Sequence, residues 1–209
     1  TRPEYCTVGD DKYLRIWSVE SRKLLREIDM KAVSRCCTYS PDGYMIAVGF
    51  GKGKGTKNDD GMIRVYRDDP DKPSEPPIQI FETKEAKQWI SEIKFSPDGR
   101  TLAVGSHDNS VYLYGVNKQF KRKGKFSKHS SYITHIDFSS DSKVMQTNCG
   151  AYELLFSDVS NGKQIMKSEA LKDVHFNTSW TCPLGWPVLG IWAEGCLLYT
   201  SPSPRDCRL

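Results

Sequence analysis

Four segments of this 209-residue chain repeat one pattern, an alternating apolar and polar run that an aromatic residue closes. The closing aromatics recur 42–49 residues apart and are Trp17, Tyr66, Tyr114 and Phe156, which are expected to be buried core residues rather than part of a cofactor site. A turn marker falls between them, as Ser-Pro-Asp-Gly at 40–43 and 96–99 and as Ser-Ser-Asp-Ser at 139–142. A period of about 40–50 residues made of short strands is typical of β-propeller blades. The period therefore predicts an all-β chain and argues against an enzyme.

Each blade is expected to hold four antiparallel strands. The third repeat shows them best, at residues 90–95, 101–106, 111–114 and 123–126. The predicted blades are a partial one at about 1–30 and three full ones at 31–85, 86–128 and 129–170. Propeller rings typically close with 4–8 blades. The sequence therefore predicts an incomplete ring within a partial propeller over residues 1–195.

The pattern changes after residue 170. Three Trp fall within residues 180–192, which predicts a buried Trp-rich connector over 171–195. Residues 196–209 resemble translated adapter or vector sequence, so a non-native tail is expected there. The alternative is a disordered segment with Ser-Pro phosphorylation sites at Ser201 and Ser203.

Composition excludes several kinds of protein. With 30 Lys and Arg against 26 Asp and Glu, the charge is too balanced to indicate nucleic-acid binding. No apolar run reaches the roughly 18 residues of a membrane span. Seven Cys without a Cys-x-x-Cys spacing indicate free thiols in a reducing compartment. The four His are scattered and no nucleophile–base pair stands out, so no metal, cofactor or catalytic residue is expected.

The repeat resembles the WD-repeat family, in which a His, a Ser or Thr, an Asp and a strand Trp often form a hydrogen-bonded set. The Asp is present six residues before the aromatic at Asp11, Asp60 and Asp108. The Trp is present only at Trp17, and His129 lies in a blade with Gly150 at the Asp position. No blade has the whole set, so apolar packing is expected to hold the blades.

This incomplete set resembles one subfamily, the echinoderm microtubule-associated protein-like proteins. The matching segments are residues 103–116, 129–138 and above all 180–192, and the resemblance covers about residues 5–195. It implies atypical tandem propellers, a longer multi-propeller parent and a cytoplasmic scaffold on the cytoskeleton that binds tubulin and microtubules. The alternative is a general WD-repeat adaptor that presents loops to other proteins.

Residues 118–128 form the densest run of positive charge in the chain. The six cations, with no acidic residue among them, are Lys118, Lys121, Arg122, Lys123, Lys125 and Lys128. Such a basic loop could bind the acidic tails of tubulin, with an attraction that salt screens within about 10 Å at 0.1 M. The alternative is a solvated loop and outer strand whose lysines protect a sheet edge. The Gly- and Lys-rich loop at 51–60 is expected to be a spacer rather than a contact loop.

Overall fold

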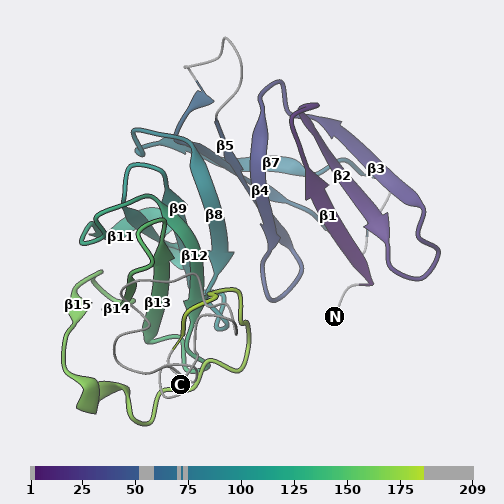
Figure 1. Ribbon diagram of the computed structural model, residues 1–209. Coiled ribbons are helices and arrows are strands. Elements are labelled where there is room, and N and C mark those ends of the chain that lie inside the picture. The colour runs from purple at the N-terminus through teal and green to yellow at the C-terminus, as the bar shows by residue number, and fades with distance from the viewer. Residues whose placement is uncertain (1–2, 52–58, 70–71, 73–74, 186–209) are drawn as a thin grey trace, which may run out of the picture.

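The computed structural model describes residues 3–51, 59–69, 72 and 75–185. The chain forms four antiparallel sheets, and each is built from strands that follow one another in the sequence (Figure 1). The first sheet has three strands, β1 (Glu4–Val8), β2 (Tyr13–Ser18) and β3 (Leu24–Asp29). The other three sheets have four strands each. Together they make an incomplete β-propeller, as the repeat predicts.

The second and third sheets follow the predicted strands closely. The second consists of β4 (Ser34–Tyr39), β5 (Met45–Phe50), β6 (Met62–Arg67) and β7 (Ile78–Lys84). The third consists of β8 (Ile90–Phe95), β9 (Thr101–Ser106), β10 (Val111–Gly115) and β11 (Lys121–Phe126), with a 3-10 helix, η2 (Val116–Lys118), before the last strand.

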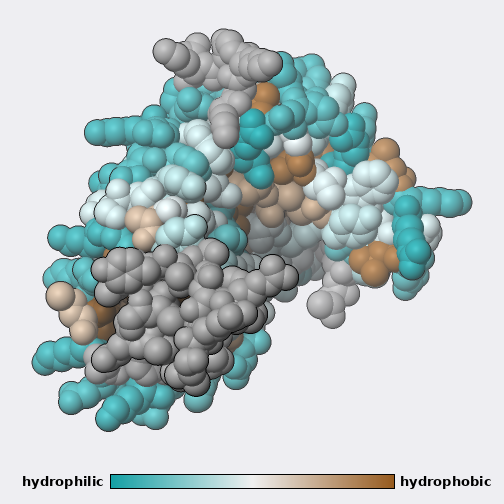
Figure 2. Space-filling view, viewed as in Figure 1, coloured by the Kyte–Doolittle hydropathy of each residue, from teal (hydrophilic) through white to brown (hydrophobic). Residues whose placement is uncertain are grey.

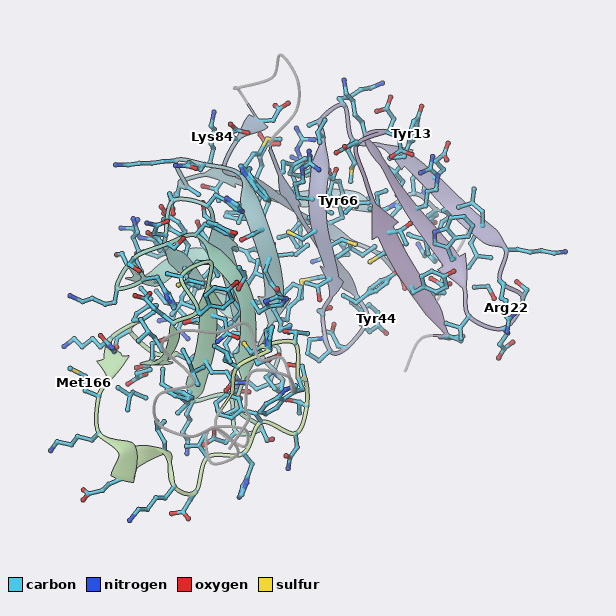
Figure 3. The ribbon with its side chains drawn as sticks, viewed as in Figure 1. Tyr13, Arg22, Tyr44, Tyr66, Lys84 and Met166 are labelled. Carbon is cyan, nitrogen blue, oxygen red and sulfur yellow. The ribbon has the colours of Figure 1, made fainter. Side chains whose placement is uncertain are left out.

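The fourth sheet has a short outer strand. Its members are β12 (Ile133–Phe138), β13 (Val144–Cys149), β14 (Leu154–Asp158) and β15 (Gln164–Ile165), and the 3-10 helix η3 (Ser168–Leu171) follows. Beyond β15, Met166 is 85% exposed and lies at the margin of the molecule (Figure 3). Within the described residues, neither 3-10 helix has the length or apolar character to cross a bilayer.

The strands β4, β8 and β12 lie side by side and form the inner row of the propeller. The repeated aromatic lies on the third strand of each full sheet, as Tyr66 on β6 and Tyr114 on β10, but on the second strand of the first sheet, as Trp17 on β2. Among the described residues, the first sheet therefore lacks the inner strand. Its first strand, β1, therefore corresponds to β5 and β9. It packs against β4 of the next sheet (Figure 1).

Apolar side chains fill the spaces between neighbouring sheets. Between the first two sheets, Leu14 and Ile16 pack with Ile46 and Tyr66, whose ring lies in this space (Figure 3). Equivalent clusters join the second sheet to the third and the third to the fourth. Burial of these side chains at about 25 cal/mol per Å² is the main force that holds successive sheets together.

Close approach of the sheets explains a glycine near the end of two strands, β5 and β9. A Cβ built on Gly49 would lie 2.6 Å from Ile90 Cγ2, and one built on Gly105 would lie 2.7 Å from Ile133 Cγ2. Both distances are below any normal contact. The absence of a side chain at these glycines therefore allows the inner strand of the next sheet to pack closely.

The Ser-x-Asp turn marker joins the inner strand of each full sheet to the next strand. In the third sheet, Ser96 Oγ donates to Asp98 Oδ1 at 2.5 Å and accepts from the Thr101 N–H at 2.9 Å. The changed copy at Ser139 and Asp141 makes the same pair of bonds, at 2.6 Å and at 2.9 Å to the Val144 N–H. The turn therefore depends on its Ser and Asp rather than on its Pro.

Three of the four repeated aromatics are core residues, as predicted. Tyr66, Tyr114 and Phe156 are 2–7% exposed. Trp17 is only half-buried, and its ring stacks on Tyr5 at 6.3 Å. The expectation for Trp17 is wrong because no described sheet covers that face of β1 and β2. Apolar surface is visible over this part of the molecule, at the right of the view (Figure 2).

The segment after η3 packs along the fourth sheet. Leu171, Phe176 and Cys182 are buried, but Trp180 is 42% exposed. The predicted buried connector is therefore only partly buried within the described residues. The rest of it, and the expected tail at 196–209, lie outside them.

Candidate functional site

The basic segment is mainly a β-strand, and the outer strand predicted at residues 123–126 begins two residues earlier, at Lys121. Residues 121–126 form β11, which pairs in antiparallel register with β10 and is the outer strand of the third sheet. Positive φ angles at Gln119 and Phe120 turn the chain into this strand. The Phe120 ring is buried and stacks on Phe81 at 4.9 Å, which fixes the start of the basic segment against the second sheet.

The six cations do not form one continuous patch. Arg122 lies 2.9 Å from Glu85, and the Lys125 ammonium lies 4.8 Å from the centre of the Tyr112 ring, so both point toward the second sheet. A register shift in the β10–β11 pair places Lys123 on the other face, where its ammonium donates to Thr101 Oγ1 at 2.9 Å. Alternation along the strand therefore divides the charge between two faces.

Three of the cations remain available to a partner. Lys118, Lys121 and Lys128 are exposed, and within the described part of the chain they form no ion pair or side-chain hydrogen bond. They lie in η2, at the start of β11 and just after its end. They are the residues of the basic segment that an acidic partner could bind without first breaking a contact.

A groove of about 500 Å³ opens on the Lys123 side, between the third and fourth sheets. Its charged lining residues are Asp98, Arg100, Lys123, Lys143 and Asp158. Three cations and two carboxylates give it mixed charge, so it has no strong preference for an anion. Of the loop at 51–60, residues 52–58 lie outside the described residues.

Some hydrogen bonds of the WD-repeat His, Ser or Thr, Asp and Trp set are present, but they are distributed among different sheets. In the first sheet, Trp17 Nε1 donates to Thr7 Oγ1 at 2.9 Å, while Asp11 lies 2.5 Å from Arg15. That ion pair holds the pKa of the Asp11 carboxyl below its usual value. The first sheet therefore contains both the Trp–Thr hydrogen bond and the Asp, but Asp11 pairs with Arg15 and is not joined to Trp17 or Thr7 by a described hydrogen bond.

In the third sheet, Asp108 hydrogen-bonds to Tyr112 rather than to the repeat aromatic Tyr114. Asp108 Oδ2 accepts from the Tyr112 hydroxyl at 2.7 Å and from the Lys87 N–H at 2.8 Å. Burial and this contact raise the pKa of Tyr112. Asp108 therefore joins β10 to the connection between the second and third sheets. In the second sheet, Asp60 and Tyr66 are the residues at the repeat positions of the Asp and of the closing aromatic.

The fourth sheet contains a polar network that the sequence did not reveal. His129 Nε2 lies 2.7 Å from Thr147 Oγ1, and His129 Nδ1 lies 3.1 Å from Glu153 Oε2. Glu153 also accepts from Ser130 Oγ at 2.7 Å and from Cys149 Sγ at 3.2 Å. Glu153 thus supplies the carboxylate that is absent at Gly150. The sequence signal was an acidic residue in the same turn, three positions away from the repeat position.

Burial and hydrogen bonding set the protonation of this network. Burial lowers the pKa of His129, which keeps the ring neutral, although Glu153 opposes the effect. Burial alone would raise the pKa of Glu153, but the bonds from Ser130, Cys149 and His129 outweigh it and hold the pKa at about 2. The ligand atoms of His129, Cys149 and Glu153 lie within 4.8 Å of one another, so they could bind a metal ion. Their mutual hydrogen bonds already give each of them a structural role.

A second feature missed from sequence is a ladder of aromatic rings beside the inner strands. Trp89 stacks on His107 at 3.4 Å, and His107 stacks on Tyr132 at 4.3 Å. The ladder ends at a cleft of about 290 Å³, whose lining includes Tyr132, Tyr152 and Leu184. Tyr132 and Tyr152 are 41% and 63% exposed. The surface of this recess is mainly apolar.

Asp137 fixes the final segment to the inner strands. Its buried carboxylate accepts from Lys94 at 2.9 Å, from Ser179 Oγ at 2.7 Å, and from the N–H groups of Thr181 and Cys182 at 2.7 and 2.8 Å. Burial would raise its pKa, but these donors hold it at about 2. Lys94 is on β8, so one carboxylate joins β8, β12 and residues 179–182.

The four-sheet arrangement and its inner row of strands define the protein as part of a β-propeller. The sequence profile of the family described as "Echinoderm microtubule-associated protein second beta-propeller" matches residues 1–198. The chain belongs to this family.

Three relatives show the extent of the similarity. Echinoderm microtubule-associated protein-like 2 from Homo sapiens is 36% identical over 202 residues, which cover 93% of this chain and 28% of the relative. Echinoderm microtubule-associated protein-like 3 from Homo sapiens is 34% identical over 195 residues, covering 91% and 20%. The 77 kDa echinoderm microtubule-associated protein from Strongylocentrotus purpuratus is 36% identical over 201 residues, covering 93% and 27%. The chain spans less than a third of the length of these relatives.

Proposed function

We propose that this chain is a segment of a non-enzymatic, cytoplasmic scaffold of the cytoskeleton, of the WD-repeat type, whose propeller surfaces bind tubulin and microtubules. Membership of a family named for microtubule association carries the proposal. The basic segment supports it, because three of its cations are exposed and uncommitted on the outer edge of the third sheet. No catalytic residue, metal, cofactor, nucleic acid or membrane enters the proposed function.

The contact would be electrostatic at this edge. Lys118, Lys121 and Lys128 can approach an acidic segment of tubulin without losing an ion pair, whereas Arg122 and Lys123 would first have to leave Glu85 and Thr101. Exposed charges lose most of their attraction beyond about 10 Å at 0.1 M salt. Binding through this segment should therefore weaken steeply as salt rises.

Co-sedimentation of the full-length protein that carries this chain with microtubules tests the proposal. Absence from the pellet, together with no capture of soluble tubulin, would contradict it. Charge reversal of Lys118, Lys121 and Lys128 to Glu should reduce the bound fraction several-fold. Reversal of Lys167 and Lys172, exposed cations beyond the fourth sheet, is the matched control and should leave binding nearly unchanged.

The alternative function is a general protein-interaction adaptor without specificity for tubulin. The apolar cleft beside Tyr132, Tyr152 and Leu184 favours it, because a recess with exposed aromatics suits a peptide side chain. Full binding by the variant with reversed charges would remove the basic segment from the interface. Failure to bind tubulin at all, combined with binding to other proteins that a Tyr152→Ala change abolishes, would favour the adaptor.

A further inference from the structure

Two thiols face each other between the first and second sheets. Cys6 is on β1 and Cys37 is on β4, and these strands lie side by side (Figure 1). The Cys6 Sγ–H donates to Cys37 Sγ at 3.4 Å, and the Cys37 thiol lies 3.5 Å from the Cys6 carbonyl oxygen. Both cysteines are half-buried, so a small solute can reach them.

The repeat shows that this pair replaces an ordinary apolar contact. Cys6 on β1 pairs with Ile16, as Ala47 on β5 pairs with Val65, so Cys6 is the structural equivalent of Ala47. Cys37 is two residues before the last residue of β4, the position of Ile93 in β8. Ala47 and Ile93 belong to one apolar cluster.

The next pair of sheets repeats the arrangement with Ala103 and Ile136. Two successive contacts between sheets therefore use Ala and Ile at this level. Only the first described contact uses two cysteines.

We propose that Cys6 and Cys37 form a redox pair that closes into a disulfide bond linking the first sheet to the second when a peroxide is present. The sulfurs are already in contact and lie on strands that pack against each other. Closure needs a further approach of little more than 1 Å to reach the S–S bond length of about 2.05 Å. Cys36 does not compete, because its side chain points to the opposite face, where it packs with the cluster between the second and third sheets.

The chemistry balances with hydrogen peroxide as the oxidant. The Cys37 thiolate attacks one peroxide oxygen, the O–O bond breaks, and a sulfenic acid and hydroxide result. The Cys6 sulfur then attacks the sulfenic sulfur, the S–S bond forms, and the S–O bond breaks. The departing hydroxide takes the Cys6 proton, so two thiols and one peroxide give one disulfide and two waters.

The surroundings favour this order of attack. The hydrogen bond from Cys6 lowers the pKa of Cys37, so Cys37 is the better thiolate of the two. The same contact, followed by burial, raises the pKa of Cys6, which keeps Cys6 protonated until the second step. A thiolate and a waiting thiol are the two parts that a redox-sensing pair requires.

Peptide mapping of the full chain tests the proposal. The folded protein is treated with hydrogen peroxide, free thiols are blocked with N-ethylmaleimide, and linked peptides are identified by mass spectrometry. The expected product joins Cys6 to Cys37 and is lost on treatment with dithiothreitol. The link should persist in Cys36→Ala and be absent in Cys37→Ala.

A second measurement does not require a variant. The disulfide closes a loop of about 31 residues, so the oxidised chain should melt higher than the reduced chain by about 5 °C or more, reversibly. Oxidation in urea is the control, because the unfolded chain should give a mixture of pairings. A folded chain that shows no Cys6–Cys37 link at a dose that oxidises the unfolded chain, or that links Cys37 to Cys36, would overturn the proposal.

Discussion

The Lys94 ammonium lies 2.9 Å from the Asp137 carboxylate, between the inner strands β8 and β12. The Asp137 side chain has no exposed surface, and that of Lys94 is 16% exposed. The same carboxylate accepts the N–H groups of Thr181 and Cys182, so the ion pair also fixes the segment that follows the fourth sheet.

Asp137→Ala should be strongly destabilising, by about 3–5 kcal/mol, because the buried Lys94 keeps only the more distant Glu92 carboxylate, at 3.5 Å, and the N–H groups of Thr181 and Cys182 lose their acceptor. Urea unfolding should show the loss as a lower midpoint. Asp173→Ala, an exposed acidic position on the same final segment, is the control and should change the free energy of unfolding by less than about 0.5 kcal/mol. A small effect of Asp137→Ala would mean that the carboxylate does not join the strands.

Gly105→Ala should destabilise the chain by about 1–3 kcal/mol, since the added methyl would overlap Ile133 of the next inner strand. Gly115→Ala, on the neighbouring strand β10, is the control, because its nearest neighbour is the flexible Lys123 side chain at 3.4 Å. Thermal unfolding should separate the two variants. Equal melting temperatures would contradict the close approach of the third and fourth sheets.

The period of the aromatics was sufficient to predict the strands, because propeller strands follow one another and pair locally. Residues 90–95 and 101–106 agree with the predicted bounds residue for residue. Contacts that do not repeat could not be predicted in this way. The bond from Thr181 to Asp137 joins residues 44 positions apart, and nothing in the period relates them.

The candidate site was less predictable than the fold. The run of cations at 118–128 is plain in the sequence, but its division between two faces depends on a register shift opposite Leu113 and Tyr114. A shift of one residue reverses which face a side chain takes. Glu153 was missed for a similar reason, because Tyr152 adopts a positive φ that redirects the turn before it.

Stability should fall as pH rises from about 4.5 toward neutrality because of Glu92. Burial raises the pKa of this carboxyl to about 7, above the roughly 4.3 of an unfolded chain, and the nearby Lys94 only partly opposes the shift. The folded state therefore binds more protons than the unfolded state between about pH 4.5 and 7, and stability declines across that window. Glu92→Gln should remove most of this decline, as measured by urea unfolding from pH 5 to 8. An unchanged slope in the variant would assign the pH dependence to another group.

Glu153→Gln should weaken the network around His129. The amide keeps one acceptor oxygen but loses the charge that accepts from Ser130, Cys149 and His129, so we expect a loss of about 1–2 kcal/mol. The carboxylate is stabilised in the folded state, with a pKa of about 2, so its contribution is present above the unfolded pKa of roughly 4.3 and declines as pH falls toward 2. The difference between wild type and variant should therefore be largest at pH 7, fall to about half near pH 3 and become small only near pH 2. Glu169→Gln, at an exposed position on η3, is the control and should match wild type across this pH range. An equal loss of stability in Glu169→Gln would contradict a specific contribution of the Glu153 carboxylate.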